Sequence, residues 1–112
     1  MACGNPFCLH YNFLSLTLYI KKQKIMNILL EQGWSEIDSK LIKNYVLSDF
    51  THAIKFINLI AEDAEKVDHH PDIKLYKYKN VRVTLTTHSK RRITEKDISL
   101  AKQIDKIFDS IN

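Results

Sequence analysis

The chain of 112 residues has the length of one domain, and a domain of this size buries only a modest core. With 45% apolar residues, 27% charged residues, two glycines and two prolines, the composition excludes a disordered or low-complexity protein. The net charge of +4 permits contact with anions, but its spread along the chain makes a nucleic-acid partner unlikely as the main function.

Residues 1–21 differ from the rest of the chain. The first 20 residues contain no Asp, Glu, Lys or Arg, and the apolar run that ends them is too short to span a membrane. A secretory signal would place positive charge before such a run, whereas here the lysines follow it. Cys3 and Cys8 lack the spacing of a zinc site, and the remaining chain has no cysteine. We therefore expect an N-terminal extension at 1–21 and a cytoplasmic domain at 22–112, or an organellar one if residues 1–25 act as a targeting segment.

The first half of the predicted domain begins with a helix over 22–32. Ile25, Ile28 and Leu29 share one face of it, and Gly33 is well placed to end it. We expect Trp34, which follows, to pack in or at the edge of the core. Short apolar stretches then predict two strands joined by a polar turn. The apolar residues of these strands are Ile37, Leu41, Ile42, Tyr45 and Val46.

The clearest amphipathic helix comes next. Ser48 is expected to be its N-cap, with Asp49 in the first turn. Pro71 forbids simple continuation, so the helix should end near residues 66–68. Its apolar positions recur at helical spacing and predict a core-facing side. They are Phe50, Ala53, Ile54, Ile57, Ile60, Ala61 and Ala64.

Two strands and a last helix complete the chain. Residues 73–78 alternate loosely, and residues 81–88 alternate well, with Val81, Val83 and Leu85 on one side and His88 closing the other. A capping box over residues 94–97 opens the last helix. Its apolar face is Leu100, Ala101, Ile104, Ile107, Phe108 and Ile111. The order of elements predicts an α+β fold, a four-stranded antiparallel sheet with three helices packed on one face.

Three of the five histidines frame the two later strands. His69 and His70 follow the long helix, and His88 closes a strand, near the acids Asp68 and Asp97. Histidine has the pKa best suited to proton transfer near neutral pH, which favours a general acid–base site. Three histidines can also hold zinc, but adjacent residues in extended chain point in opposite directions. No serine or cysteine near them has the context of a catalytic nucleophile.

An ordered set of motifs resembles the pterin-4a-carbinolamine dehydratase family. The set comprises "EKVDHHP" from Glu65 to Pro71, an aromatic residue at Tyr76 or Tyr78, "VRVTLTTH" ending at His88, and "TEKD" ending at Asp97. The Gly33-Trp34 pair and the helix before the histidines also look like the family. The resemblance runs from about residue 26 to the end of the chain.

The resemblance implies a dehydratase that converts 4a-hydroxytetrahydropterin to quinonoid dihydropterin and water, and so recycles tetrahydrobiopterin. It implies no cofactor and no metal. It places His69, His70 and His88 at the catalytic centre. The substrate-binding residues that it implies are Glu65, Asp68, Thr86, Thr87, Ser89 and Asp97.

The resemblance also implies partners. We expect a pterin as the small-molecule substrate, a homodimer or homotetramer, a link to an aromatic amino acid hydroxylase, and no membrane. The apolar face of the last helix could serve such self-assembly. Alternatives are a dimerisation cofactor of a homeodomain transcription factor, or action on a molybdopterin-type compound.

One departure from the family lies in the loop before the last helix. Family members usually carry a glycine where this chain has Arg92. We expect that loop to be more basic, and its backbone to be strained if arginine must take a glycine conformation.

Overall fold

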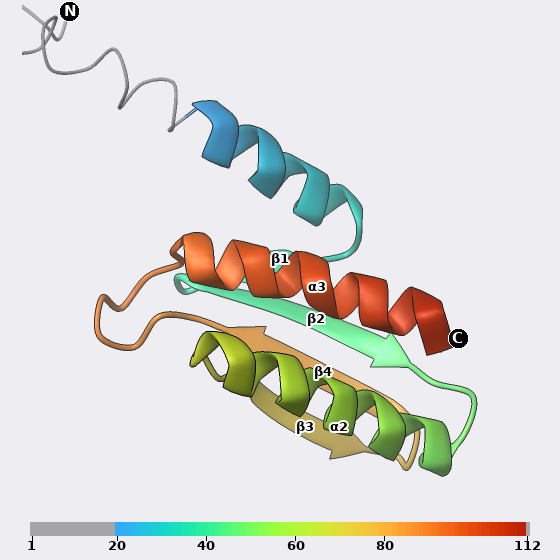
Figure 1. Ribbon diagram of the computed structural model, residues 1–112. Helices are drawn as coiled ribbons and strands as arrows, with labels where there is room; N and C mark the ends of the chain where they lie inside the picture. Colours follow the sequence, from blue (N-terminus) through green and yellow to red (C-terminus); the bar gives the residue numbers. More distant parts are fainter. Residues whose placement is uncertain (1–19, 112) are drawn as a thin grey trace, which may run out of the picture.

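The computed structural model describes residues 20–111, and their helices and strands follow the predicted order (Figure 1). The extension expected at 1–21, with Cys3 and Cys8, lies outside the described residues except for its last two, which are helical. A helix over residues 20–31 comes first. It is followed by β1 (Ser35–Ile37), β2 (Lys40–Val46), α2 (Phe50–Val67), β3 (Asp72–Tyr76), β4 (Asn80–Leu85) and α3 (Glu95–Ile111).

The four strands form one antiparallel sheet in the order β1-β2-β4-β3. Two residues, Asp38 and Ser39, close the hairpin of β1 and β2, and three residues, 77–79, close the hairpin of β3 and β4. Asp38, Ser39, Lys77 and Tyr78 all have positive φ. A two-residue turn of this kind matches the twist of the flanking strands. The three-residue turn explains why β3 ends at Tyr76 instead of running to residue 78, as the alternation predicts.

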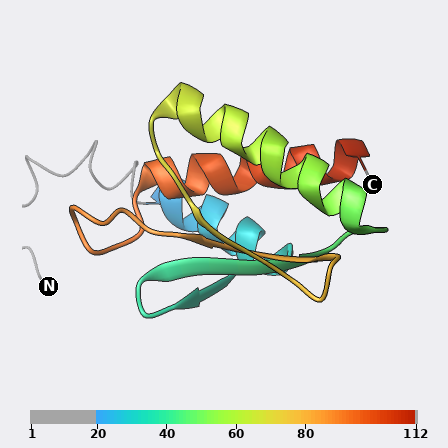
Figure 2. The ribbon, with the colours of Figure 1, turned by 90° about the horizontal axis from the view of Figure 1, so that it is seen from below.

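All three helices lie on one face of the sheet, which confirms the predicted α+β fold (Figure 2). Val81, Val83 and Leu85 of β4 are fully buried beneath them, as the alternation predicts. Arg82, on the opposite face of the same strand, is exposed. The first helix ends at residue 31, and Gly33, in the turn that follows, has a φ of +104°, which suits glycine and few other residues.

The start of α2 is one residue later than the sequence suggests. Asp49, not Ser48, is the N-cap: its backbone is extended and its side chain accepts a hydrogen bond from the His52 N–H at 2.8 Å. That N–H bond, joined by the His52 ring, lowers the pKa of the Asp49 carboxyl. Ser and Asp are about equally good N-caps, so the propensity of the two neighbours alone could not decide between them.

The buried stripe of α2 is narrower than its apolar pattern predicts. Ala53, Ile60 and Ala64 are buried as expected, together with Phe56, which is not part of the predicted apolar face. Phe50 and Ile54, expected in the core, are 52% and 38% exposed, and Ala61 is exposed too.

The predicted apolar face of α3 lies inside the fold. Its residues are either buried or packed against the core. It therefore does not supply the exposed surface expected there for a partner. The exposed apolar residues of α2 lie elsewhere, on the outer side of that helix.

A polar cluster ties α3 to the first hairpin. Asp105 accepts hydrogen bonds from Trp34 Nε1 at 3.0 Å, Lys43 Nζ at 2.8 Å and Tyr45 Oη at 2.5 Å. Burial, and then the neighbouring Asp105 carboxylate, raises the pKa of Tyr45 far above its usual value. Trp34 is only 2% exposed, as expected of a packing residue, and its N–H has a partner.

Between residues 20 and 111, no helix is both long enough and apolar enough to cross a membrane.

Candidate active site

Three segments meet at one end of the molecule: the C-terminal end of α2, the loop from β4 to α3, and the first turn of α3 (Figure 1). These segments carry all three predicted catalytic histidines. The antiparallel order of the sheet brings them together, because the connections leaving α2 and β4 emerge on the same side.

The end of α2 sets the directions of His69 and His70. Asp68 takes the left-handed conformation with φ 51°, and its N–H donates to the carbonyls of Ala64 and Glu65. The N–H of His69 donates to the carbonyl of Ala64 at 3.1 Å. This arrangement closes the helix and turns the chain sharply. Asp68, predicted to bind substrate, is thus also the residue that ends α2.

His69 is buried and held by a carboxylate. Its Nε2 donates to Asp97 Oδ1 at 2.5 Å, because a carboxylate in this position can only accept. Within residues 20–111 no hydrogen bond to Nδ1 of His69 is formed. A carboxylate at one nitrogen fixes the orientation and tautomer of the ring and stabilises the imidazolium, while the other nitrogen stays available for proton transfer.

Asp97 is the centre of a larger network. Its Oδ2 accepts hydrogen bonds from Thr87 Oγ1 at 2.8 Å and from the Thr94 N–H at 2.9 Å. The second of these is the predicted capping-box bond. Asp97 has no exposed surface, so its donors replace water completely. One carboxylate therefore caps α3 and joins the two segments that carry histidines.

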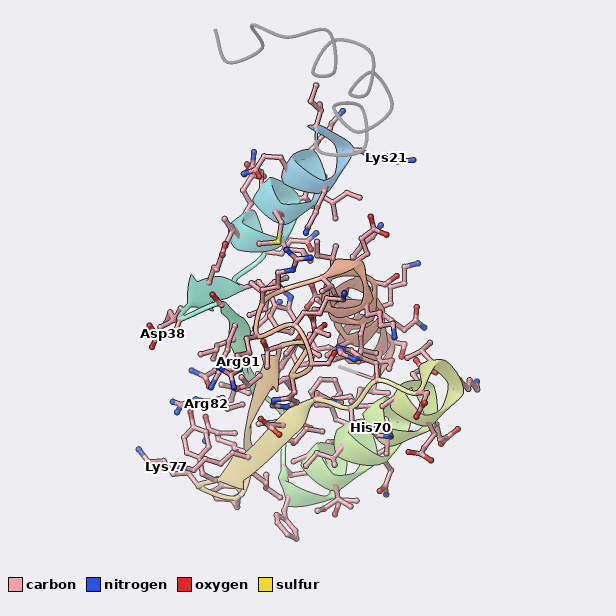
Figure 3. All side chains as sticks on the ribbon, turned by 90° about the vertical axis from the view of Figure 1, so that its left-hand side faces the viewer. Lys21, Asp38, His70, Lys77, Arg82 and Arg91 are labelled. Carbon is pink, nitrogen blue, oxygen red and sulfur yellow. The ribbon has the colours of Figure 1, made fainter. Side chains whose placement is uncertain are left out.

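His70 points away from His69. Its Nε2 contacts Glu65 Oε2 on the last turn of α2, and both side chains are more than half exposed. Figure 3 shows His70 beside the end of α2, on the outside of the fold. The opposite orientation expected for the adjacent pair is confirmed. Glu65 thus joins the site as a partner of histidine.

The segment after β4 departs from the predicted strand. The strand ends at Leu85 instead of His88, and Thr87 then forms an isolated bridge with Arg92. Thr86 is buried, although the alternation predicts the outer face, and its Oγ1 donates to the carbonyl of Ser39 at 3.0 Å. His88 and Ser89 lie in the following turn and are exposed.

The unusual backbone conformation of this loop falls at Arg91, not at Arg92. Arg91 has φ 51°, whereas Arg92 is not among the residues with positive φ. The carbonyl of Arg92 accepts from the Thr87 N–H at 3.0 Å in the bridge. The arginine in the family glycine position therefore causes none of the expected left-handed strain. Figure 3 shows Arg91 on this loop.

The described residues do not group into a metal site. No set of three His, Cys, Asp or Glu side chains between residues 20 and 111 converges on one point. His69 and His70 bind separate carboxylates, which are placed on α3 and α2. The arrangement instead presents one buried imidazole, His69, held by a carboxylate, and two exposed imidazoles, of which His70 also contacts a carboxylate.

The best-defined cavities among residues 20–111 have no histidine in their lining. One of about 440 Å³ lies between α2 and α3 and is lined by Lys66, Val67 and Leu100 among others. A second, about 370 Å³, lies directly beside the histidine segments, with Thr87 and Ser89 in its wall. Lys22 and Lys96 also line it, and neither is among the site residues predicted from the sequence. Nothing local in the sequence marks them, because they come from different helices that only the fold brings together.

Comparison with known proteins gives a consistent result. Residues 19–107 match the family model described as pterin 4 alpha carbinolamine dehydratase. A protein of Herpetosiphon aurantiacus, provisionally named a pterin-4-alpha-carbinolamine dehydratase, is 48% identical over 70% of this chain and 83% of its own length. A protein of Sulfolobus acidocaldarius with the same provisional name is 42% identical over 68% and 82%.

Two solved structures share the fold. A transcriptional coactivator/pterin dehydratase from Brucella melitensis is 37% identical, with a TM-score of 0.66 over 73% of this chain and 90% of that one. A pterin dehydratase-like protein identified as a RuBisCO assembly factor of the alpha-carboxysome is 20% identical, with a TM-score of 0.58 over 68% and 89%, and it shows the fold alone. Since the family model covers most of the chain and several relatives exceed 40% identity, this chain belongs to the pterin-4a-carbinolamine dehydratase family.

Proposed function

We propose that this protein catalyses the dehydration of a 4a-hydroxytetrahydropterin to the quinonoid dihydropterin and water. The observation that carries the proposal is the buried His69–Asp97–Thr87 network, which lies at the same end of the fold as the exposed His70 and His88. Family membership supports the substrate class. Neither the recycling of tetrahydrobiopterin nor a link to an aromatic amino acid hydroxylase is needed for the chemistry, and both remain part of the proposal.

The reaction needs two proton transfers. The hydroxyl on C4a leaves as water after an acid gives it a proton, and a base removes the proton from N5 as the C4a–N5 double bond forms. The protein gains one proton and loses one, so neither a metal nor an electron carrier has to enter the balance. In the proposal His69 exchanges one proton through Nδ1 while Asp97 stabilises its charged form. One of the exposed histidines, His70 or His88, exchanges the other.

The substrate-binding roles proposed for the remaining residues follow from their positions. Thr87 and Asp97 hold the network rigid, and the exposed Ser89 and Glu65 offer polar groups at its rim. Thr86 is held by the Ser39 carbonyl, so its hydroxyl is engaged, and we propose that it fixes the loop. Asp68 orients both adjacent histidines by ending α2.

The test is the decay of enzymatically generated 4a-hydroxytetrahydropterin, followed by ultraviolet absorbance with and without the protein. We expect acceleration, and a loss on the order of 10²-fold in each of His69→Ala and His88→Ala. His52→Ala is the matched control, because His52 is a half-exposed histidine paired with Asp49 at the other end of α2. Near-normal rates in both site variants would disprove the proposed roles.

Self-association is proposed separately, with a second copy of the chain as the partner. Phe50 and Ile54 lie one helical turn apart on the outer side of α2, and both are exposed. Large exposed apolar residues that adjoin one another are typical of interaction surfaces. Sedimentation velocity should show a dimer or tetramer, and Phe50→Lys/Ile54→Lys should shift it to a smaller species. Unchanged sedimentation of the variant would place the contact elsewhere.

A further inference from the structure

Four basic residues converge on one cavity beside the histidine site. The cavity of about 370 Å³ is lined by Lys22, Lys90, Arg92 and Lys96, with Glu95 as its one acidic residue. A volume of this size lies within the range of small-molecule pockets, about 300–1,000 Å³. Its charge comes from three separate parts of the fold: the first helix, the loop after β4 and the start of α3.

These four charges are not used by the fold itself. Between residues 20 and 111, none of the four side chains forms an ion pair, whereas Lys43 and Lys66 do. The four positive charges around this cavity are offset only in part by Glu95, so they repel one another, and an anion bound between them lowers that repulsion. Cationic donors prefer carboxylate or phosphate oxygens, and arginine can bind phosphate through two parallel hydrogen bonds.

The neutral part of the lining fits the same ligand. Ser89 adds a hydroxyl group to the wall, and a hydroxyl can donate to a phosphate oxygen, whereas the hydroxyls of Thr87 and Thr94 are engaged within the wall itself. Thr87 and Thr94 bond each other and Asp97, so the wall of the cavity is continuous with the network that holds His69. Ser89 directly follows His88 in the chain. A ligand held at the histidines therefore has the cationic cavity next to it.

We propose that this cavity binds a phosphate ester on the side chain of the pterin, so that the substrate class is phosphorylated reduced pterins. The inference rests on the proposed function, since it assumes that the pterin ring is held at the histidines. Arg92 is the one arginine in the lining of the cavity, and its planar guanidinium is the group there that can bind a phosphate through two parallel hydrogen bonds.

The test compares two stable fluorescent probes, neopterin and neopterin 3′-monophosphate, by quenching of pterin fluorescence on titration with the full chain. One charge-assisted hydrogen bond is sufficient for about a tenfold difference in affinity, so we expect the phosphate ester to bind at least tenfold more tightly. Arg92→Ala should remove most of this preference. Arg91→Ala is the matched control: it removes the same charge from the adjacent residue, which does not line the cavity.

A second variant keeps the test independent of one side chain. Lys90→Ala/Lys96→Ala should also weaken the binding of the phosphate ester and leave the binding of neopterin unchanged. Inorganic phosphate should compete with the ester for binding but not with neopterin. Equal affinities for the two probes, no binding of either, or a preference that survives both variants would overturn the inference. So would tight binding of a single-stranded oligonucleotide without any preference for the ester, because the charges would then serve nucleic acid.

The two proposals fail separately. Dehydration of unphosphorylated 4a-hydroxytetrahydropterin without any phosphate preference would leave the dehydratase proposal standing and refute the cavity assignment. A phosphate preference removed by Arg92→Ala, without dehydratase activity, would support the assigned cavity and refute the proposed reaction.

Discussion

Asp97 and Asp105 lie eight residues apart on α3, on the side of the helix that faces the rest of the fold, and each accepts hydrogen bonds from distant parts of the chain. Asp97 binds His69, Thr87 and the N–H of Thr94, and has no exposed surface. The Asp105 side chain retains 15% exposure. The rise of a helix places the two carboxylates about 12 Å apart along its axis.

Both aspartates accept several hydrogen bonds, but the groups that donate these bonds differ in their ability to exchange protons. The donors to Asp105 are an indole, an ammonium and a phenol, which cannot exchange protons readily near neutral pH. One donor to Asp97 is an imidazole, which can. A buried carboxylate that accepts several hydrogen bonds is therefore not in itself a sign of catalysis. The chemical identity of the donors decides whether the carboxylate can support proton transfer.

The largest expected effect separates the two residues by activity. Asp97→Asn replaces one carboxylate oxygen, which accepts hydrogen bonds, by an amide nitrogen, which donates them. That nitrogen must then face a group that now donates to Asp97. The substitution should lower the dehydration rate on the order of 10²-fold to 10³-fold. Asp105→Asn should change the rate by about twofold at most, because it lies beyond the network of His69. Steady-state rates of the two folded variants check this, and equal losses would refute the division of roles.

The next effect is on stability and concerns Asp105. Asp105→Ala leaves the Trp34 N–H, the Tyr45 hydroxyl and the Lys43 ammonium without their acceptor. We expect the free energy of unfolding to fall by about 2–3 kcal/mol in urea titrations. Asp109→Ala is the control on the same helix, an exposed site where a change of about 0.5 kcal/mol or less is expected. Similar losses in both variants would mean that the Asp105 cluster adds nothing specific.

A smaller effect concerns Tyr45 and alkaline pH. Folding raises the pKa of Tyr45 above its unfolded value of 10.0, so the unfolded chain loses this proton at lower pH than the folded chain. The contribution of the protonated Tyr45 hydroxyl to the free energy of unfolding is complete below pH 10, and it is lost as the pH rises above 10. Urea titrations at pH 9 and pH 11 should show a decline that is shallower in Tyr45→Phe. An equally steep decline of the free energy of unfolding in Tyr45→Phe would mean that other groups cause the pH dependence.

The smallest effect belongs to the exposed cap of α2. Folding lowers the pKa of the Asp49 carboxyl below its usual 3.8. The ionised carboxylate therefore contributes to stability above pH 3.8, and this contribution is lost as the pH falls through the lowered pKa of the folded state. Asp49→Ala should be slightly less stable than the parent at pH 7 and equal to it near pH 2. Thermal unfolding at the two pH values measures this. A difference that persists at pH 2 would come from the helix propensity of alanine or from another cause.

The secondary structure was largely predictable because it depends on local patterns. The alternation of Val81, Val83 and Leu85 has a period of two and identified a half-buried strand, which the structure confirms. The ends of elements were less accurate. The strand stops at Leu85 because Thr86 and Thr87 bond to Ser39 and Asp97, and neither partner is close in sequence.

The sequence predicted which residues belong to the candidate site, but it did not predict the environment of each of them. The motif around His69 and His70 placed them at the end of α2, and Asp68 ends that helix within the expected range. Which histidine would be buried could not be read from the sequence, because the environment of each ring depends on its partner. His69 meets a carboxylate 28 residues away, whereas His70 meets one 5 residues away.

The sequence by itself determined the order of helices and strands, the single sheet with helices on one face, and the family, since these follow from hydrophobic period and ordered motifs. Only the tertiary structure decided which polar groups meet. Asp105 binds partners 60 to 71 residues away, and Lys22 shares a cavity with Arg92 and Lys96. Such pairings depend on how the layers stack, and the stacking is fixed by the burial of the whole apolar core rather than by any local stretch of chain.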